Sequence, residues 1–209
     1  MMEKSAPIAA LFLDIGGVLL TNGWEHQSRE LAATVFNLDL VELNDRHQLT
    51  FETYEAGKIT LEEYLSLVVF FRKRTFSRIE FRNFMFEQSK PYSDMIELMC
   101  KLKAQYGLKI AVVSNEGREL NTYRIRKFKL DEFVDFFISS CFVHLRKPDN
   151  DMFRMALDIA QIPAEQVVYI ENQPMFVQVA GEEGIRGIHH TNYTSTRKQL
   201  ASLGLEITE

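Results

Sequence analysis

The sequence predicts an α/β fold, a doubly wound parallel sheet with a helical insertion near its N-terminal end. Two observations support this prediction. From residue 92 onward, short apolar runs alternate with amphipathic segments of helical length, whereas residues 22–90 have helical periodicity only. Because consecutive parallel strands are joined by right-handed helical crossovers, the alternation indicates a Rossmann-like sheet with helices on both faces.

The first expected strand, Ile8–Leu13, is short, uncharged and apolar, which is typical of a strand buried on both faces. Asp14 then stands at its carboxyl end, where open parallel sheets place their ligand crevice. Gly16 and Gly17 allow the backbone to turn tightly and to approach a bound group. Asp14 therefore points to a functional site, although an aspartate that only ends a strand and starts a turn would look the same.

The insertion is expected to contain four helices and no strand. Two of them begin at capping boxes, in which a hydroxyl side chain and a glutamate side chain each accept a hydrogen bond from the other residue's backbone N–H: Thr60 with Glu63, and Ser77 with Glu80. The expected helices are Glu25–Asn37, Val41–Glu55, Leu61–Arg72 and Ile79–Gln88. We therefore expect residues 22–90 to form a helical cap, and residues 1–21 and 91–209 to form the α/β core.

The second part of the core is expected to supply four more strands, each followed by a helix. Gly107 marks the C-terminus of one of these helices and Asp149 the N-terminus of another. The expected strands are Lys109–Val113, Phe136–Ser139, Gln166–Ile170 and Gly184–Ile188. The expected helices are Met95–Tyr106, Gly117–Phe128, Asp149–Ala160, Pro174–Ala180 and Ser195–Leu203.

The composition narrows the class of protein. A net charge of −5 and a pI near 5.6 argue against a nucleic-acid-binding surface. Cys100 and Cys141 lie far apart in apolar surroundings, which favours buried free thiols and a reducing compartment. The apolar stretch at the N-terminus is too short for a signal peptide or a membrane span, so we expect a cytoplasmic protein with no membrane partner. The oligomeric state stays open.

Several expected strands end in polar residues that could face one crevice. Carboxylate, hydroxyl, amide and ammonium groups together suit a phosphoryl group and a divalent cation such as Mg²⁺, which takes oxygen ligands. Taken singly, a strand-end hydroxyl or a helix-start lysine is more often structural. The residues are Asp14, Ser114 with Asn115, Lys147, and Glu171 with Asn172.

Four stretches, in order, resemble the motifs of the haloacid dehalogenase-like (HAD) hydrolases: LFLDIGGVLL, VVSN, RKPD and VYIENQPMFVQVAGEEGI. Residues 22–90 are similar to the cap that many members insert after the first strand, and YEAGKITLEEYL resembles a stretch of the phosphatase-like branch. The resemblance covers almost the whole chain. It implies the HAD core fold and hydrolysis of a small phosphorylated metabolite with Mg²⁺.

The resemblance also implies a role for each matching residue. Asp14 matches the nucleophile that becomes an aspartyl-phosphate, and Lys147 the lysine that balances charge. Ser114 and Asn115, with Gly17, match the phosphate-binding position. The metal would be held by Asp14, the backbone carbonyl of Gly16, and Asn172 with Glu171 beside it.

Two positions depart from the family pattern. Gly16 stands where the family has the aspartate that acts as general acid and base, a group typically worth ~10² to 10⁴ in rate. Asn172 replaces a metal-binding aspartate, which predicts weaker Mg²⁺ binding. Two interpretations follow: a slowed phosphatase that acts on good leaving groups, or an impaired member that binds a phosphorylated ligand or a protein partner without turnover. Carbon–halogen or carbon–phosphorus cleavage ranks lower, since Gly16 is not aromatic and Lys58 is the only lysine in the early cap.

Overall fold

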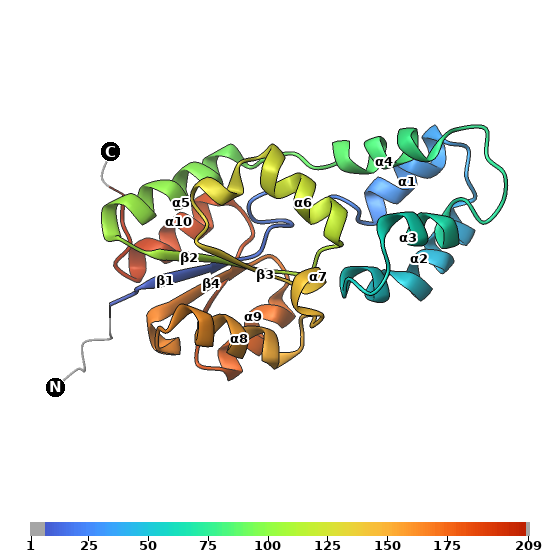
Figure 1. Cartoon of the computed structure of the whole chain (residues 1–209). Helices are drawn as coiled ribbons and strands as arrows, with labels where there is room; N and C mark the ends of the chain where they lie inside the picture. Colours follow the sequence, from blue (N-terminus) through green and yellow to red (C-terminus); the bar gives the residue numbers. More distant parts are fainter. Residues whose placement is uncertain (1–6, 208–209) are drawn as a thin grey trace.

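A parallel sheet forms the centre of the computed structural model, which describes residues 7–207 (Figure 1). Its five strands have the order β3-β2-β1-β4-β5, so β1 is the central strand. In this sheet Leu13 lies opposite Val112 of β2 and Ile170 of β4. The strands are β1 (Ala10–Leu13), β2 (Lys109–Ser114), β3 (Phe136–Ser139), β4 (Val167–Glu171) and β5 (Arg186–His189). All four neighbouring pairs are parallel, which confirms the predicted fold class.

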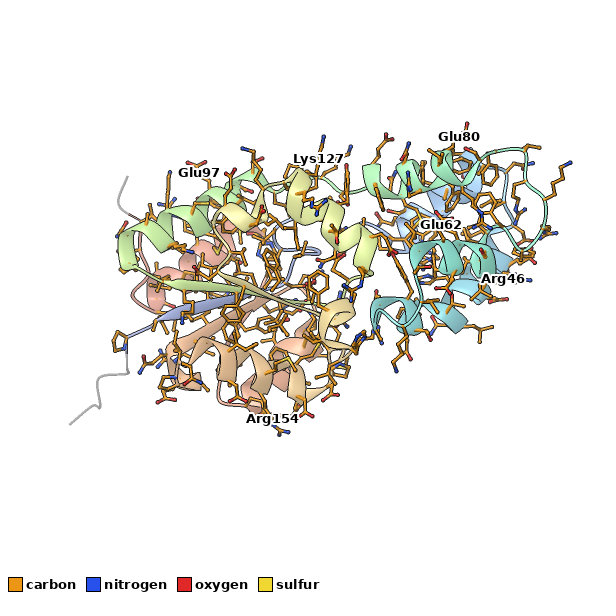
Figure 2. The ribbon with its side chains drawn as sticks, in the orientation of Figure 1. Arg46, Glu62, Glu80, Glu97, Lys127 and Arg154 are labelled. Carbon is orange, nitrogen blue, oxygen red and sulfur yellow. The ribbon has the colours of Figure 1, made fainter. Side chains whose placement is uncertain are left out.

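Helices cover both faces of the sheet, so alternate residues of β1 enter different cores. Leu11 and Leu13 pack with α5 (Ser93–Tyr106) and α10 (Tyr193–Ser202) on one face. Ala10 and Phe12 pack with α8 (Asn150–Ala160) and α9 (Pro174–Glu182) on the other. Burial on both faces explains why the strand carries no polar residue before Asp14. The labelled charged side chains of these helices, among them Glu97 and Arg154, point away from the sheet (Figure 2).

Four helices between residues 26 and 87 pack around an aromatic core of their own, and the described chain has no strand there. They are α1 (His26–Val35), α2 (Leu40–Glu55), α3 (Leu61–Val68) and α4 (Arg78–Glu87). Both expected capping boxes are present, at Thr60 and at Ser77. Helix α3 ends at Val68 and not at Arg72 as expected, because Phe70 leaves the helix and packs its ring against Phe76 and Phe81.

Two linkers, residues 14–25 between β1 and α1 and residues 88–92 between α4 and α5, join the helical part to the sheet and run side by side. The backbone N–H of Thr21 donates to Lys90 O at 2.9 Å, and that of Tyr92 donates to Leu19 O at 2.9 Å. The buried guanidinium of Arg124, on α6 (Arg118–Lys127), braces both linkers by donating to Thr21 O and to Ser89 Oγ. This pairing supports our proposed division into a core and a cap at residues 22–90. The outermost expected core residues, 1–6 and 208–209, lie outside the described chain.

The cap also rests on a short helix that the sequence pattern did not indicate, α7 (Ser140–Val143). Ser140 Oγ donates to Glu55 O at 2.7 Å, and His144 Nδ1 lies 2.7 Å from Ala56 O. The end of α2 is thereby fixed against the core. Two 3₁₀ turns, η1 (Leu130–Glu132) and η2 (Ala164–Gln166), complete the chain. Both cysteines are free thiols, and none of the helices within residues 7–207 is long and apolar enough to cross a membrane.

Candidate functional site

Asp14 lies at the floor of a cavity of about 320 Å³ between the carboxyl ends of the central strands and α2 of the cap. Its backbone N–H donates to Ile170 O at 3.0 Å, which extends the ladder between β1 and β4 by one residue. Its Oδ1 accepts a hydrogen bond from Ile15 N at 2.9 Å. The carboxylate is only 12% exposed, and that exposed part faces the cavity. The strand therefore fixes both the position and the direction of this carboxylate.

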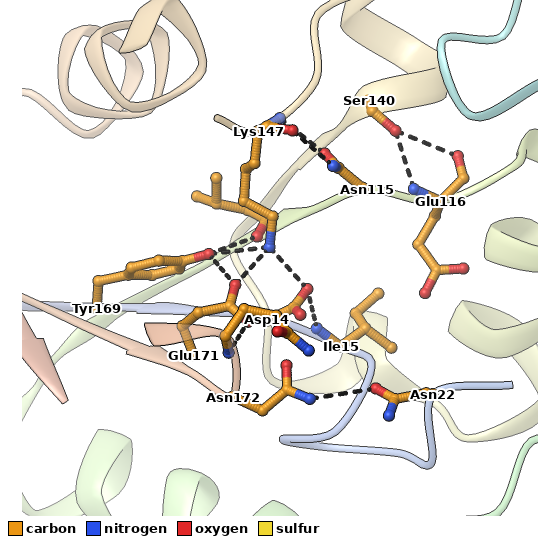
Figure 3. Close-up of polar contacts among 12 residues, drawn as sticks. Asp14, Ile15, Asn22, Asn115, Glu116, Ser140, Lys147, Tyr169, Glu171 and Asn172 are labelled. Carbon is orange, nitrogen blue, oxygen red and sulfur yellow. Dashed lines mark hydrogen bonds and ion pairs between the residues drawn. The ribbon is translucent and has the colours of Figure 1, made fainter. Parts of the chain in front are cut away.

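Lys147 lies beside Asp14 and is fully buried (Figure 3). Its ammonium is 3.2 Å from Asp14 Oδ1, 2.6 Å from Glu171 Oε2 and 2.9 Å from Tyr169 OH. An ammonium group has three N–H donors, so these contacts use all of them. Burial alone would lower the pKa of Lys147, but the Asp14 and Glu171 carboxylates outweigh it and raise that pKa. Lys147 is therefore a fixed positive charge next to Asp14.

Glu171 does not lie where the sequence suggested a metal ligand. It is fully buried, and both carboxylate oxygens already have partners. Oε2 accepts from Lys147 and from Tyr169 OH at 2.6 Å, and Oε1 accepts from Gln173 N at 2.9 Å. Burial and the nearby Asp14 charge raise the pKa of Glu171. Its position suits the anchoring of Lys147, a role that Tyr169 shares and that sequence reasoning missed.

Asn115 also differs from its expected role. Its Oδ1 accepts from Lys147 N at 2.9 Å, and its Nδ2 donates to Lys147 O at 3.0 Å. The amide oxygen and one of the two amide N–H groups therefore clamp the Lys147 backbone, while Asn115 still lines the cavity. Ser114, at the end of β2, is buried and lines the cavity as expected.

Gly16, Asn22 and Asn172 line one side of the cavity, and Gly17, expected to bind phosphate, packs behind Asn172 without lining it. Gly17 has a positive φ of 74°, and a Cβ atom there would lie 2.2 Å from Asn172 Nδ2, so only glycine allows this close approach. Asn172 Nδ2 donates to Asn22 Oδ1 at 3.4 Å. A Cβ atom at Gly16 would lie 3.3 Å from the same Asn22 oxygen. Asn22, from the first linker, therefore occupies the space next to the missing side chain of residue 16.

The oxygens on this side of the cavity fit a magnesium ion. Within residues 7–207 no group of three or more His, Cys, Asp or Glu residues could hold a metal, so amide and carbonyl oxygens would have to contribute. The hydrogen bond from Asn172 Nδ2 to Asn22 leaves Asn172 Oδ1 as the free atom of the amide. Mg²⁺ accepts such oxygen ligands together with water and substrate phosphate. Asp14, the Gly16 carbonyl and Asn172 are thus the residues that could hold it.

The cap wall of the cavity is formed by Phe51 and Glu55 on α2, with Arg146 from the core. Arg146 Nη2 lies 2.7 Å from Glu55 Oε2 and Nη1 lies 3.2 Å from Glu52 Oε1. The guanidinium also lies 5.0 Å from the Phe51 ring centroid. Burial raises the pKa of Glu55 despite the opposing charge of Arg146. No local sequence pattern indicates this ion pair, since its partners are far apart along the chain.

Glu116 is the remaining acid of the cavity, and it forms a buried ion pair with Arg124. Burial raises the pKa of Glu116 to about 7, against the opposing effect of Arg124. Trp24 packs inside the cap and does not line the cavity: its Nε1 donates to Tyr64 OH at 2.8 Å and its ring packs edge-on against Phe81.

This floor of paired charges under a helical cap is the arrangement expected for a hydrolase of the HAD class. The family model for haloacid dehalogenase-like hydrolases matches residues 8–178, and the chain belongs to that family. A crystal structure of the HAD family enzyme BT-2542 from Bacteroides thetaiotaomicron is similar, with a TM-score of 0.73, 20% identity, and coverage of 88% of this chain and 93% of that one. The same enzyme has also been crystallised with magnesium and inorganic phosphate.

Two curated relatives are similar over part of their length. Flavin mononucleotide hydrolase 1 of Arabidopsis thaliana is 25% identical over 165 residues, which are 79% of this chain and 66% of the relative. A pyrophosphatase-like protein, PpaX, of Caldanaerobacter subterraneus subsp. tengcongensis is 28% identical over 100 residues, 48% of this chain and 45% of the relative. The chain thus spans about half to two thirds of the curated relatives that it matches.

Proposed function

We propose that this protein is a Mg²⁺-dependent phosphatase of small phosphorylated metabolites, with Asp14 as the nucleophile. One observation carries the proposal: the Asp14 carboxylate faces a cap-covered cavity while the Lys147 ammonium holds it at 3.2 Å. The positive charge offsets the repulsion between an anionic nucleophile and an anionic phosphate, in a setting where charges interact strongly. The magnesium and phosphate complex of BT-2542 supports the same chemistry.

In this mechanism Asp14 attacks phosphorus, the bond to the leaving oxygen breaks, and an aspartyl-phosphate forms. Water then attacks that phosphorus, releases inorganic phosphate and restores the Asp14 carboxylate. Ser114, which lines the cavity, holds a phosphoryl oxygen, and the Lys147 ammonium offsets the charge of the phosphoryl group through its position beside Asp14. Bound Mg²⁺, held by Asp14, the Gly16 carbonyl and Asn172, would neutralise phosphate charge.

The cavity favours a small leaving group. Its volume of about 320 Å³ is near the lower end of the range usual for ligand pockets, ~300 to 1,000 Å³. The phosphoryl group and its cation fill part of that space. Acyl phosphates and small sugar phosphates fit this volume better than a flavin nucleotide does.

A second candidate function is binding without turnover. Gly16 lacks the acid that the family uses, and Asn172 supplies no charge for a cation. Both departures leave Ser114 in the cavity and the positive charge of Lys147 beside Asp14. A protein that holds a phosphorylated ligand without hydrolysing it would have the same floor.

Phosphate release from acetyl phosphate, a small sugar phosphate and an alkyl phosphate separates the two functions. Each is incubated with Mg²⁺ or with EDTA. We expect turnover with Mg²⁺ only, and its complete loss in Asp14→Asn because the nucleophile is gone. Asp158→Asn, an exposed acid on α8, is the matched control and should keep full activity. Binding of inorganic phosphate with no release from any of the three substrates would overturn the phosphatase and leave the binding function.

A further inference from the structure

The missing acid at residue 16 raises the question of which group protonates the leaving oxygen. Besides Asp14, the described residues that line the cavity include two carboxylic acids, Glu55 and Glu116. Glu55 lies on the cap wall and Glu116 follows the phosphate-binding stretch of β2. Neither position matches the family's acid in sequence, so the choice between them depends on geometry.

Glu116 is poorly placed to release a proton. It is 5% exposed, and its carboxylate pairs with the fully buried Arg124 guanidinium. That guanidinium also binds both linkers, through Thr21 O and Ser89 Oγ. Protonation of Glu116 would leave a buried positive charge without its counter-ion, which is costly. The pair is therefore suited to holding the linkers together.

Glu55 is better placed than Glu116 to donate a proton to a bound substrate. It belongs to the cap, so it faces the floor of the cavity where Asp14 lies. In phosphoryl transfer the leaving oxygen departs roughly in line with the attacking oxygen and on the far side from it. Attack from Asp14 therefore directs the leaving oxygen toward the cap. The Glu55 side chain is 26% exposed, so a substrate can reach it.

The two oxygens of Glu55 are not equivalent. Oε2 accepts both hydrogen bonds from Arg146, from Nε at 3.1 Å and from Nη2 at 2.7 Å. Oε1 has no hydrogen-bond donor among residues 7–207. Arg146 thus fixes the carboxyl group in place while leaving one oxygen to carry a proton. Arg146 is a positioning residue in this arrangement.

We propose that Glu55 is the general acid and base of this site, supplied by the cap in place of the aspartate that Gly16 replaces. The proposal rests on the phosphatase function proposed above. In the first step the proton on Glu55 Oε1 moves to the leaving oxygen as the P–O bond breaks and the bond from Asp14 to phosphorus forms. In the second step Glu55, now a carboxylate, takes a proton from the attacking water and returns to its acid form.

The surroundings of Glu55 shift its pKa in both directions. Burial and the Asp14 carboxylate raise its pKa, while Arg146 and Lys147 lower it, and the net direction is upward. Glu52 on the same helix and the buried Glu116 add negative charge nearby. A raised pKa keeps the acid form populated at higher pH than for an ordinary glutamate. Activity on a poor leaving group should therefore fall on the alkaline side as Glu55 loses its proton.

The test compares Glu55→Gln, Glu52→Gln and Glu116→Gln on two substrates, acetyl phosphate and an alkyl phosphate. A proton matters most where the departing oxygen is most basic. We expect Glu55→Gln to lose ~10² to 10⁴ in kcat on the alkyl phosphate, to lose much less on acetyl phosphate, and to lack the alkaline decline of wild type. Glu52→Gln is the matched control, because Glu52 also pairs with Arg146 but does not line the cavity. It should keep both activities.

Three results would overturn the role of Glu55. The first is an equal loss on both substrates in Glu55→Gln, which would indicate a role in binding or cap closure. The second is a loss that depends on the leaving group in Glu116→Gln in place of Glu55→Gln. The third is a wild type that hydrolyses acetyl phosphate but no alkyl phosphate. A wild type that hydrolyses neither substrate refutes the phosphatase itself, so the two failures are distinguishable.

Discussion

The sheet domain and the cap bury polar groups in different ways. Beneath its carboxyl edge the sheet buries charges in pairs: Lys147 with Glu171, and Arg124 with Glu116. The cap instead contains a row of hydrogen bonds between uncharged side chains. Trp24 Nε1 donates to Tyr64 OH at 2.8 Å, and Tyr64 OH lies 2.7 Å from His47 Nδ1. Buried ion pairs therefore belong to the layer that carries the nucleophile. The covering layer uses aromatic packing, and its buried Arg29 guanidinium donates to neutral partners, Asn44 Oδ1 and Trp24 O.

This difference assigns different tasks to the two layers. A parallel sheet holds its strand ends rigidly, so ionic groups placed there keep their distances without solvent. The cap core gathers apolar side chains from all four helices and rings from three of them and from the segments between them, including Phe36, Phe70, Phe76 and Phe81. Apolar contacts have little directional preference, so this core depends less on exact distances than the ion pairs of the sheet edge do.

The sharpest test of the ionic layer is Lys147→Met. The change leaves the fully buried Glu171 carboxylate without its counter-ion, and a buried pair broken on one side costs ~3 to 5 kcal/mol. We expect a loss of that size in the free energy of unfolding, measured with urea, together with loss of phosphate release. Lys147→Met combined with Glu171→Gln removes both charges and should regain most of the stability without activity. A single variant as stable as wild type would show that Glu171 is already protonated in the native state.

A smaller effect is expected where the two layers are joined. Gly23 has a φ of 72°, and a Cβ atom there would lie 1.7 Å from Arg124 Nη2. Gly23→Ala should therefore displace the guanidinium from the linkers and lower the free energy of unfolding by ~3 kcal/mol. Gly107→Ala is the control: its φ is 66°, but no atom lies within 4 Å of the new Cβ, so ~1 kcal/mol is expected. Equal losses in thermal or urea unfolding would mean that Arg124 does not brace the linkers.

Much of the fold could be predicted from the sequence because its signals are local. The apolar runs ending at Leu13 and Val113, and the capping boxes at Thr60 and Ser77, each lie within a few consecutive residues. The short helix α7 carries no such signal, since its first residue, Ser140, and the residue after its end, His144, are held by contacts with Glu55 and Ala56 of the cap. Contacts between distant segments have no local pattern.

The site divides in the same way. Asp14, Ser114 and Lys147 were found because a strand end or a motif marks them, and the structure brings all three to one cavity. The side-chain direction of Asn115 and Glu171 could not be predicted, because it depends on whether Lys147 takes up their hydrogen bonds. Glu55 and Arg146 belong to different layers and become partners only in the folded protein.

The smallest expected effect is a dependence of cap stability on pH, which follows from the hydrogen bonds among Trp24, Tyr64 and His47. Trp24 Nε1 can only donate, so Tyr64 OH accepts that hydrogen bond and donates its own proton to His47 Nδ1. His47 Nδ1 must then be unprotonated. Burial, aided by the charge of Arg29, lowers the pKa of His47 to about 3. Protonation of His47 Nδ1 would break its hydrogen bond with Tyr64 OH and place a positive charge inside the cap.

The sign of the dependence follows from proton counting. Below the ordinary histidine pKa, ~6.5, the unfolded chain takes up a proton at His47 that the folded cap does not, so the unfolded state gains stability as the pH falls toward 3. Allowing for its partial exposure, we expect His47 to cost ~2 kcal/mol of unfolding free energy between pH 7 and pH 4. His47→Asn keeps an acceptor oxygen near the Nδ1 position and cannot titrate. Its urea unfolding curves should therefore lose less stability over that interval than those of wild type. Identical pH slopes for the two proteins would mean that His47 takes up a proton in the folded cap without disturbing its hydrogen bond with Tyr64. The uncharged hydrogen-bond network would then not be a requirement of the cap.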